Sequence, residues 1–168
     1  FFHQVHLGAM KSIVPEAIAM SFTIMSITTV TVGLITGHLV DRFSARRMLP
    51  LFLLPLSLGC IVLSYGQHSL TMVAFMFLLG MSYGVSNAVF GAIWPEVYGI
   101  RHLGSIRAVT SAAMVFASAL GPGLTGWLID IGVRFDQQLL FMSVYCLLTM
   151  MALFAAVRQL DLRLSPAR

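Results

Sequence analysis

The stretch Met48–Pro95, with the sequence MLPLFLLPLSLGCIVLSYGQHSLTMVAFMFLLGMSYGVSNAVFGAIWP, contains no Asp, Glu, Lys or Arg. A helix that crosses a bilayer needs about 20 mostly apolar residues, so this stretch is too long for a single crossing. The segment Tyr65–Ser69 gathers Gly, Gln, His and Ser near its middle, which is typical of a turn. The stretch therefore predicts two membrane-spanning helices joined by a short turn.

Further uncharged stretches lie on both sides, at residues 17–40, 108–129 and 137–157. Each is long enough for one crossing, and no short alternating segments of the barrel type occur. The predicted fold is therefore an all-α membrane protein with five full transmembrane helices. A partial one, the end of an earlier helix, is expected at residues 1–10. The predicted spans cover residues 14–40, 48–66, 69–94, 104–130 and 137–160.

The composition excludes several classes of protein. Of the 168 residues, 58% are hydrophobic and 10% charged, whereas soluble domains carry about 25% charged residues. The net charge of +4 comes from short clusters between apolar runs, so no nucleic-acid partner is expected. His3 and His6 could share a helix face, but no further ligand is near them, so no metal or cofactor is expected either.

The positive charges are distributed unequally between the two ends of the predicted helices. Lys11 and Arg134 fall on one side of the membrane. The other side receives Arg42, Arg46, Arg47, Arg101, Arg107, Arg158, Arg163 and Arg168. The positive-inside rule makes this second side cytoplasmic, together with the C-terminus. We therefore expect an integral protein of a bacterial inner membrane.

A short repeat joins two distant helix ends. Ile35–Asp41 reads ITGHLVD and Leu124–Asp130 reads LTGWLID, with Thr, Gly, Leu and Asp shared. The first copy is predicted to end in the cytoplasm and the second outside. Two similar units of opposite orientation indicate an inverted-topology repeat. Chance similarity between apolar helices is the alternative.

The loop after the first span carries the motif GHLVDRFSARR, residues Gly37–Arg47. It resembles the signature loop of the major facilitator superfamily: a glycine, Asp-Arg four residues later, then paired basic residues. Ser44 stands where a glycine is usual, and the basic pair comes one residue late. The resemblance implies a loop that latches the two halves of a transporter in one state. Its residues here would be Gly37, Asp41, Arg42, Arg46 and Arg47; a simple positive-inside stop signal is the alternative.

The same resemblance extends over the whole chain. The five spans look like helices eight to twelve of that family, and residues 1–10 like the end of helix seven, so the chain resembles a C-terminal half that needs an N-terminal six-helix half. Phe2–Gln4, Trp94–Gly99 and Gly121–Gly123 resemble the branch of monocarboxylate transporters and oxalate/formate antiporters. The implied function is secondary active transport of a small molecule by alternating access, as a symporter or antiporter, with proton coupling as one option.

The helix predicted at residues 69–94 has three faces. Gly80, Gly84 and Gly91 form a stripe that permits close packing. Leu78, Val85, Val89 and Ile93 form an apolar face expected to meet lipid. A polar and aromatic face gathers Tyr83, Ser86, Asn87, Phe90 and Trp94. Because helix ten lines the central cavity in the family, Tyr83, Ser86, Asn87 and Trp94 are candidate substrate contacts. The alternative is an interhelical hydrogen bond by Asn87 and an interfacial position for Trp94.

The helix predicted at residues 104–130 repeats hydroxyl residues every seven positions. Ser111 and Ser118 share one side and join the candidate cavity, and Gly121-Pro122 should kink the helix. Such hydroxyls also bond their own backbone, so a packing role is the alternative.

No charged residue lies in the middle of a span, although one would mark an ion or proton site. Helices eight and eleven, which hold a cation for the carboxylate in the monocarboxylate branch, offer Thr and Ser here. Organic anion uptake therefore competes with efflux of drugs or metabolites. No span carries an acid–base pair, so no enzyme is expected. A channel or scaffold is the remaining alternative.

Overall fold

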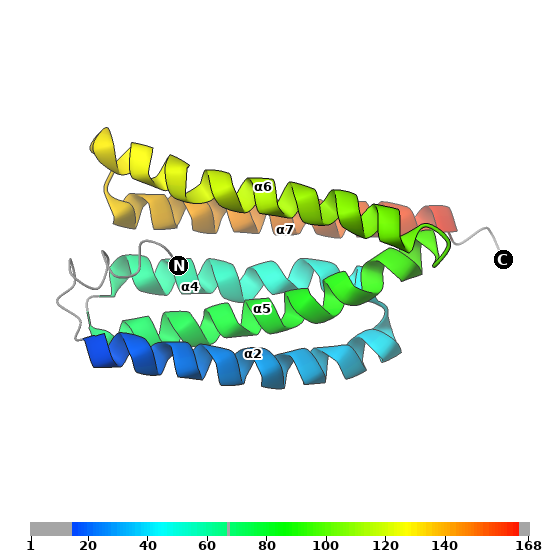
Figure 1. Ribbon diagram of the computed structural model, residues 1–168, viewed down its shortest axis with the longest axis horizontal. Coiled ribbons are helices and arrows are strands. Elements are labelled where there is room, and N and C mark those ends of the chain that lie inside the picture. The colour runs from blue at the N-terminus through cyan, green and yellow to red at the C-terminus, as the bar shows by residue number, and fades with distance from the viewer. Residues whose placement is uncertain (1–14, 67, 165–168) are drawn as a thin grey trace.

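The computed structural model describes residues 15–66 and 68–164, and these residues form helices and turns without any strand. The helices that position the site are long and nearly parallel to one another (Figure 1). In chain order the elements are α2 (Pro15–Phe43), α3 (Ala45–Met48), the 3-10 helix η1 (Leu49–Phe52), α4 (Leu53–Tyr65), α5 (Ser69–Tyr98), α6 (Leu103–Asp130) and α7 (Phe135–Leu164).

Five helical stretches in the described residues are long and apolar enough to cross a membrane, which confirms the all-α fold and the predicted count. They are Ala19–Phe43, Ala45–Tyr65, Ser69–Tyr98, Leu103–Asp130 and Phe135–Asp161. The second is built from α3, η1 and α4 in succession. α5 runs one turn beyond the predicted end, through Pro95 to Tyr98. The partial helix predicted at residues 1–10 lies outside the described residues.

The helices are paired out of chain order. α2 packs mainly on α5, α4 packs on both α5 and α7, and α6 makes its main contacts with α5. α2, α5 and α7 run toward the end where the C-terminus lies, whereas α4 and α6 run the opposite way (Figure 1). The arginine-rich helix ends therefore gather at one end of the bundle. The two copies of the Thr-Gly-x-Leu-x-Asp repeat end at opposite ends of it.

Two glycines allow α5 to approach α2 closely. A Cβ atom on Gly80 would lie 2.6 Å from the carbonyl oxygen of Met25, and one on Gly84 would lie 2.8 Å from that of Thr29. Both distances are far shorter than an ordinary contact, so only glycine fits. The Thr29 hydroxyl donates to the Met25 carbonyl at 2.8 Å and reaches the Gly80 carbonyl at 3.3 Å. Backbone contact and hydroxyl bonding thus add to apolar packing, such as that of Val40 with Val89, in holding this helix pair.

The apolar face predicted for lipid is partly wrong. Val89 is 0% exposed and Ile93 is 8% exposed. They pack with Val40 at the end of α2 and Ala45 at the start of α3. The short α3 turns back over the end of α5 and covers residues that the helical period alone assigns to lipid.

α4 and α7 meet along a seam of small polar residues. The Ser57 hydroxyl lies 3.0 Å from the Ser143 hydroxyl and 3.3 Å from the Ser143 carbonyl oxygen, with both residues buried. One end of the seam is closed by Ser64, whose hydroxyl donates to the Asp136 carbonyl at 3.0 Å. Interhelical hydrogen bonds of this kind link helices in lipid, where apolar packing alone gives little preference for one partner.

Candidate functional site

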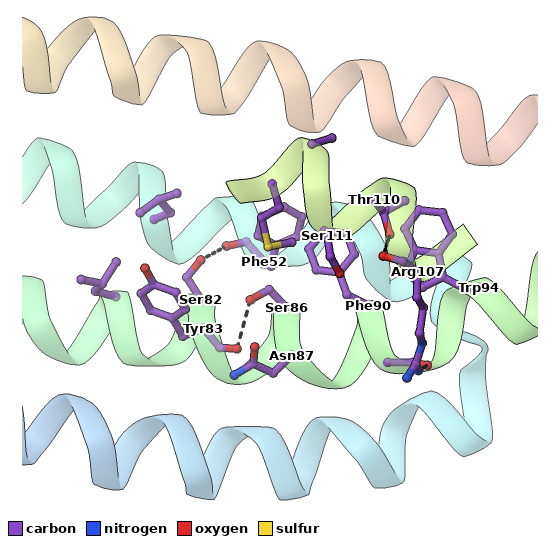
Figure 2. Close-up of a pocket in the computed structure, with 15 residues that line it drawn as sticks. Phe52, Ser82, Tyr83, Ser86, Asn87, Phe90, Trp94, Arg107, Thr110 and Ser111 are labelled. Atoms are coloured by element: carbon purple, nitrogen blue, oxygen red, sulfur yellow. Dashed lines mark hydrogen bonds between the residues drawn. The ribbon is translucent and has the colours of Figure 1, made fainter. Parts of the chain in front are cut away.

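A pocket of about 740 Å³ lies between η1, α4, α5 and α6 (Figure 2). This volume is in the range of small-molecule sites. The lining residues are Phe52, Leu56, Leu79, Ser82, Tyr83, Ser86, Asn87, Phe90, Gly91, Trp94, Arg107, Thr110, Ser111, Ala113 and Met114.

The wall formed by α5 combines satisfied and unsatisfied polar groups. The Ser86 hydroxyl donates to the Tyr83 carbonyl at 3.0 Å, and the Ser82 hydroxyl donates to the Phe52 carbonyl at 2.6 Å. No hydrogen bond of the Asn87 amide occurs among the described contacts of the chain. Because an unpaired amide is costly in an apolar medium, Asn87 is available to water or a ligand in the pocket.

Aromatic rings from η1 and α5 also line the pocket. The rings of Phe52 and Phe90 meet edge to face, with centroids 5.6 Å apart and an interplanar angle of 61°. Trp94 stacks on Tyr98 at 6.3 Å and 23°. Rings fixed in this way offer flat apolar surface for a ligand at little entropic cost.

Arg107 enters the pocket from α6 near the Trp94 end (Figure 2). Its Nη2 donates a hydrogen bond of 2.9 Å to the carbonyl oxygen of Gly91 on α5. Gly91 lies four residues before Pro95, which has no N–H to offer that carbonyl. The arginine therefore satisfies an acceptor that the helix itself leaves open.

A second polar cluster ties the loop after α2 to the end of α5. The carboxylate of Glu96 accepts hydrogen bonds from the Ser44 hydroxyl, from the Ala45 amide at 2.7 Å and from Arg46 Nε at 2.6 Å. Asp161 on α7 lies 3.7 Å from Arg46 and 3.5 Å from Arg47. Glu96 thus provides the acceptor and the negative charge that the start of α3 requires.

The backbone at Ser44 explains one departure of the loop from its family pattern. Ser44 has a φ of 83°, in the left-handed region that glycine adopts without strain. A glycine is usual at this position of the signature loop. Here the serine hydroxyl donates to Glu96, so a hydrogen bond offsets the backbone cost of about 1 kcal/mol or more.

The other loop residues have different surroundings. Asp41 and Arg42 are exposed, and the Arg42 guanidinium lies 5.5 Å from the centre of the Phe43 ring. No ion pair of Asp41 occurs among the described residues. A side chain at Gly37 would meet nothing within 4 Å. Arg46 and Arg47 of the motif are therefore paired within the described helices, whereas Asp41 and Arg42 are exposed.

Comparison with known proteins decides the family. The sequence matches the family described as Major Facilitator Superfamily over residues 4–167. The chain belongs to the Major Facilitator Superfamily. The family and the five apolar helices identify the chain as part of an integral membrane protein.

One curated relative is similar to this superfamily chain over part of its length. It is the probable plastidic glucose transporter 1 of Arabidopsis thaliana, 32% identical over 94 residues. The match covers 53% of the chain but only 18% of that protein, so the chain spans less than a fifth of the relative's length. No solved structure matches it. These findings give no support to the narrower placement with monocarboxylate and oxalate/formate carriers, which stays a prediction.

The structure brings most of the predicted cavity residues of this superfamily chain together. Tyr83, Ser86, Asn87, Trp94 and Ser111 line one pocket. Ser118 does not line it, and its hydroxyl donates to the Val115 carbonyl at 2.9 Å. The role of these six residues as substrate contacts stays a prediction.

The predicted packing and kink residues differ from one another. Gly80 and Gly84 lie at the α2–α5 contact, whereas a Cβ on Gly91 or Gly121 would meet nothing within 4 Å. α6 runs through Pro122 without a break. On the same helix the Thr125 hydroxyl bonds the Gly121 carbonyl at 3.0 Å, which is the local bonding that the packing alternative describes.

Sequence reasoning missed Glu96, Arg107 and Asp161. Arg107 was assigned only to the positive side of the membrane, yet it lies four residues before Ser111, on the same helix face. That spacing could have placed it in the pocket. Among the described residues no cluster of His, Cys, Asp and Glu could hold a metal.

Proposed function

We propose that this protein is a secondary active transporter that moves a small molecule across the membrane by alternating access. The pocket between α4, α5 and α6 carries this proposal, because it combines the Asn87 amide, which has no hydrogen bond among the described residues, with several hydroxyls and aromatic surface. A few polar groups in an otherwise apolar cavity are typical of a small-molecule site.

The five helices would form one of two bundles, the C-terminal one, that rock against each other around the substrate. The opposite directions of α2 and α6, which carry the two repeat copies, support this arrangement (Figure 1). The arginine-rich end would face the cytoplasm of a bacterial cell, with the protein in the inner membrane.

Uptake into vesicles tests the proposed activity. The full-length protein should move a labelled substrate faster when a proton gradient is imposed, if protons are coupled. Screening small organic anions, drugs and D-glucose in both directions separates anion uptake from efflux and from sugar transport; the printed name of the curated relative justifies the sugar. Flux that does not saturate would indicate a channel. The absence of flux for every class of solute would favour a scaffold role.

Replacing Asn87 by alanine is expected to raise KM by roughly three- to tenfold, because a hydrogen bond to the substrate would be lost. Tyr83→Phe should have a smaller effect of the same sign. Initial uptake rates across a substrate series measure both. Ser118→Ala, outside the pocket, is the matched control. Equal KM values in all three variants would reject the assignment of this α5 face.

Replacing Asp41 by asparagine is expected to slow turnover several-fold while substrate affinity changes little. The reason is that Asp41 is exposed at the end of α2 and does not line the pocket, so it would act in the proposed latch rather than in binding. Comparing kcat with equilibrium binding measures the two effects separately. A change in binding alone would contradict the latch.

A further inference from the structure

One aromatic residue of the pocket, Phe52, comes from an irregular part of the chain. It is the last residue of η1, between α3 and α4. A 3-10 bond to the Phe52 carbonyl would need an N–H on residue 55, but Pro55 has none. The Ser82 hydroxyl of α5 donates to that carbonyl at 2.6 Å, and Ser82 is only 5% exposed. A buried hydrogen bond from the neighbouring helix therefore holds the backbone that carries the Phe52 ring.

The ring held in this way meets a second ring on α5. Phe52 and Phe90 lie edge to face, with centroids 5.6 Å apart and an interplanar angle of 61°. Both line the pocket, and Trp94 adds a third ring (Figure 2). Aromatic rings attract a further ring in edge-to-face or offset geometry, which a saturated group cannot adopt. The arrangement thus favours a flat aromatic group over a saturated group of similar size.

Most polar side chains of the pocket donate to the protein's own backbone. The Ser86 and Thr110 hydroxyls each donate to a carbonyl of their own helix at 3.0 Å, and the Ser82 hydroxyl donates to η1. Arg107 is exposed at the arginine-rich end of the bundle and donates to the Gly91 carbonyl at 2.9 Å. A ligand therefore does not need to carry a charge or many polar groups to satisfy this pocket.

Two lining groups have hydrogen-bonding capacity left for a ligand. The Asn87 amide and the Ser111 hydroxyl form no hydrogen bond in the part of the chain that the structure describes, and both line the pocket. A sugar carries a hydroxyl on almost every carbon atom, and each hydroxyl needs a partner when it leaves water. Two such groups suit a mostly apolar molecule with one or two polar atoms better than they suit a sugar.

We infer that the pocket binds a neutral, mostly apolar molecule with a flat aromatic ring. Phe52 is a specificity-determining residue for that ring, and Ser82 is its positioning residue. This inference rests on the proposed transport function and names its substrate class.

Equilibrium binding to the full-length protein in phosphatidylcholine nanodiscs tests the ring preference. The probes are labelled naphthylmethanol and its saturated analogue decahydronaphthylmethanol, which share one carbon skeleton and one hydroxyl. Empty nanodiscs correct for partition into lipid. The flat probe should bind saturably and about three- to tenfold more tightly than the saturated probe. Phe52→Leu should remove most of this preference, whereas Phe52→Tyr, which keeps the ring, should retain it.

Phe77→Leu is the matched control for the ring. Phe77 lies on α5, is 46% exposed and does not line the pocket, so its replacement should change neither probe. Three results would each overturn the assignment: no saturable binding of naphthylmethanol, equal losses of both probes in Phe52→Leu, or an equal effect at Phe77.

A double-mutant cycle tests the positioning role of Ser82. Ser82→Ala removes the donor to η1, so the preference for the flat probe should fall about threefold when Phe52 is present and stay unchanged in the Phe52→Leu background. Ser82→Cys keeps the size of the side chain but donates weakly, so it should show a smaller loss of the same sign, and it carries the comparison if Ser82→Ala does not fold. Equal losses in both backgrounds would show a general effect on α5 and would overturn the positioning role.

Transport assays on the same protein separate the ligand class from the proposed activity. Flux of D-glucose or of an organic anion, without saturable binding of naphthylmethanol, would overturn the aromatic class and keep the transporter. Saturable binding of naphthylmethanol without flux of any solute would keep the aromatic site and overturn the transporter.

Discussion

Replacing Gly84 by alanine is expected to separate α2 from α5 and to lower the free energy of unfolding by about 2–3 kcal/mol. The added Cβ would lie 2.8 Å from the Thr29 carbonyl oxygen and 2.9 Å from the Gly33 nitrogen. Both are backbone atoms, so no side chain can turn aside to make room. Thermal unfolding in detergent, followed by size-exclusion chromatography, measures the loss.

Gly91→Ala is the matched control for this substitution. Gly91 lies on the same helix, and a Cβ there would meet nothing within 4 Å. The two changes have the same intrinsic helix propensity effect, which favours alanine by about 1 kcal/mol. Gly91→Ala should therefore be neutral or stabilising. Similar melting temperatures for the two variants would contradict the close approach of α2 and α5.

Replacing Glu96 by glutamine is expected to cost about 2 kcal/mol of stability, because hydrogen bonds to a charged acceptor are stronger than those to a neutral one. Its carboxylate accepts from the Ala45 amide and from Arg46, at 2.7 and 2.6 Å. The amide of glutamine would also turn a donor toward one of these donors. The same thermal assay measures the change.

Asp161→Asn provides the comparison within the same cluster. Asp161 contacts Arg46 and Arg47 only at 3.7 and 3.5 Å, and the Arg47 side chain is 69% exposed. Exposed pairs of this length contribute about 0–1 kcal/mol. Asp161→Asn should therefore be clearly milder than Glu96→Gln. A larger loss at Asp161 would show that the α7 pairs, rather than the Glu96 bonds, hold the loop.

The number of helices could be predicted from the sequence because charge-free stretches of membrane-spanning length rarely occur outside transmembrane helices. It also predicted which α5 residues share a face, since the helical period alone sets that: Tyr83, Ser86 and Trp94 do line one pocket. Periodicity does not tell what covers a face. Val89 and Ile93 are buried by α3. The sequence does not show this, because positions that face lipid and positions in a protein core favour the same apolar residues.

The arginine in the pocket shows a second limit of sequence reasoning. Counting the positive charges in each loop assigns Arg107 to one side of the membrane, but it does not predict that Arg107 lines a pocket. Its bond to the Gly91 carbonyl depends on Pro95 and on the return of α6 beside α5. Pro95 and Arg107 are each ordinary in the sequence, and only the tertiary structure brings them together.

The interleaved pairing of the helices has a consequence for synthesis. α4 emerges from the ribosome long before α7, yet the buried Ser57 hydroxyl finds Ser143 only on that last helix. α2 and α5 can meet earlier, because only α3, η1 and α4 lie between them in the chain. In the nascent bundle the α2–α5 pair would therefore form first. The polar face of α4 would stay without its partner in the membrane until α7 is inserted. The time between the synthesis of α5 and that of α7 would then be the time during which Ser57 lacks the partner that it has in the folded bundle.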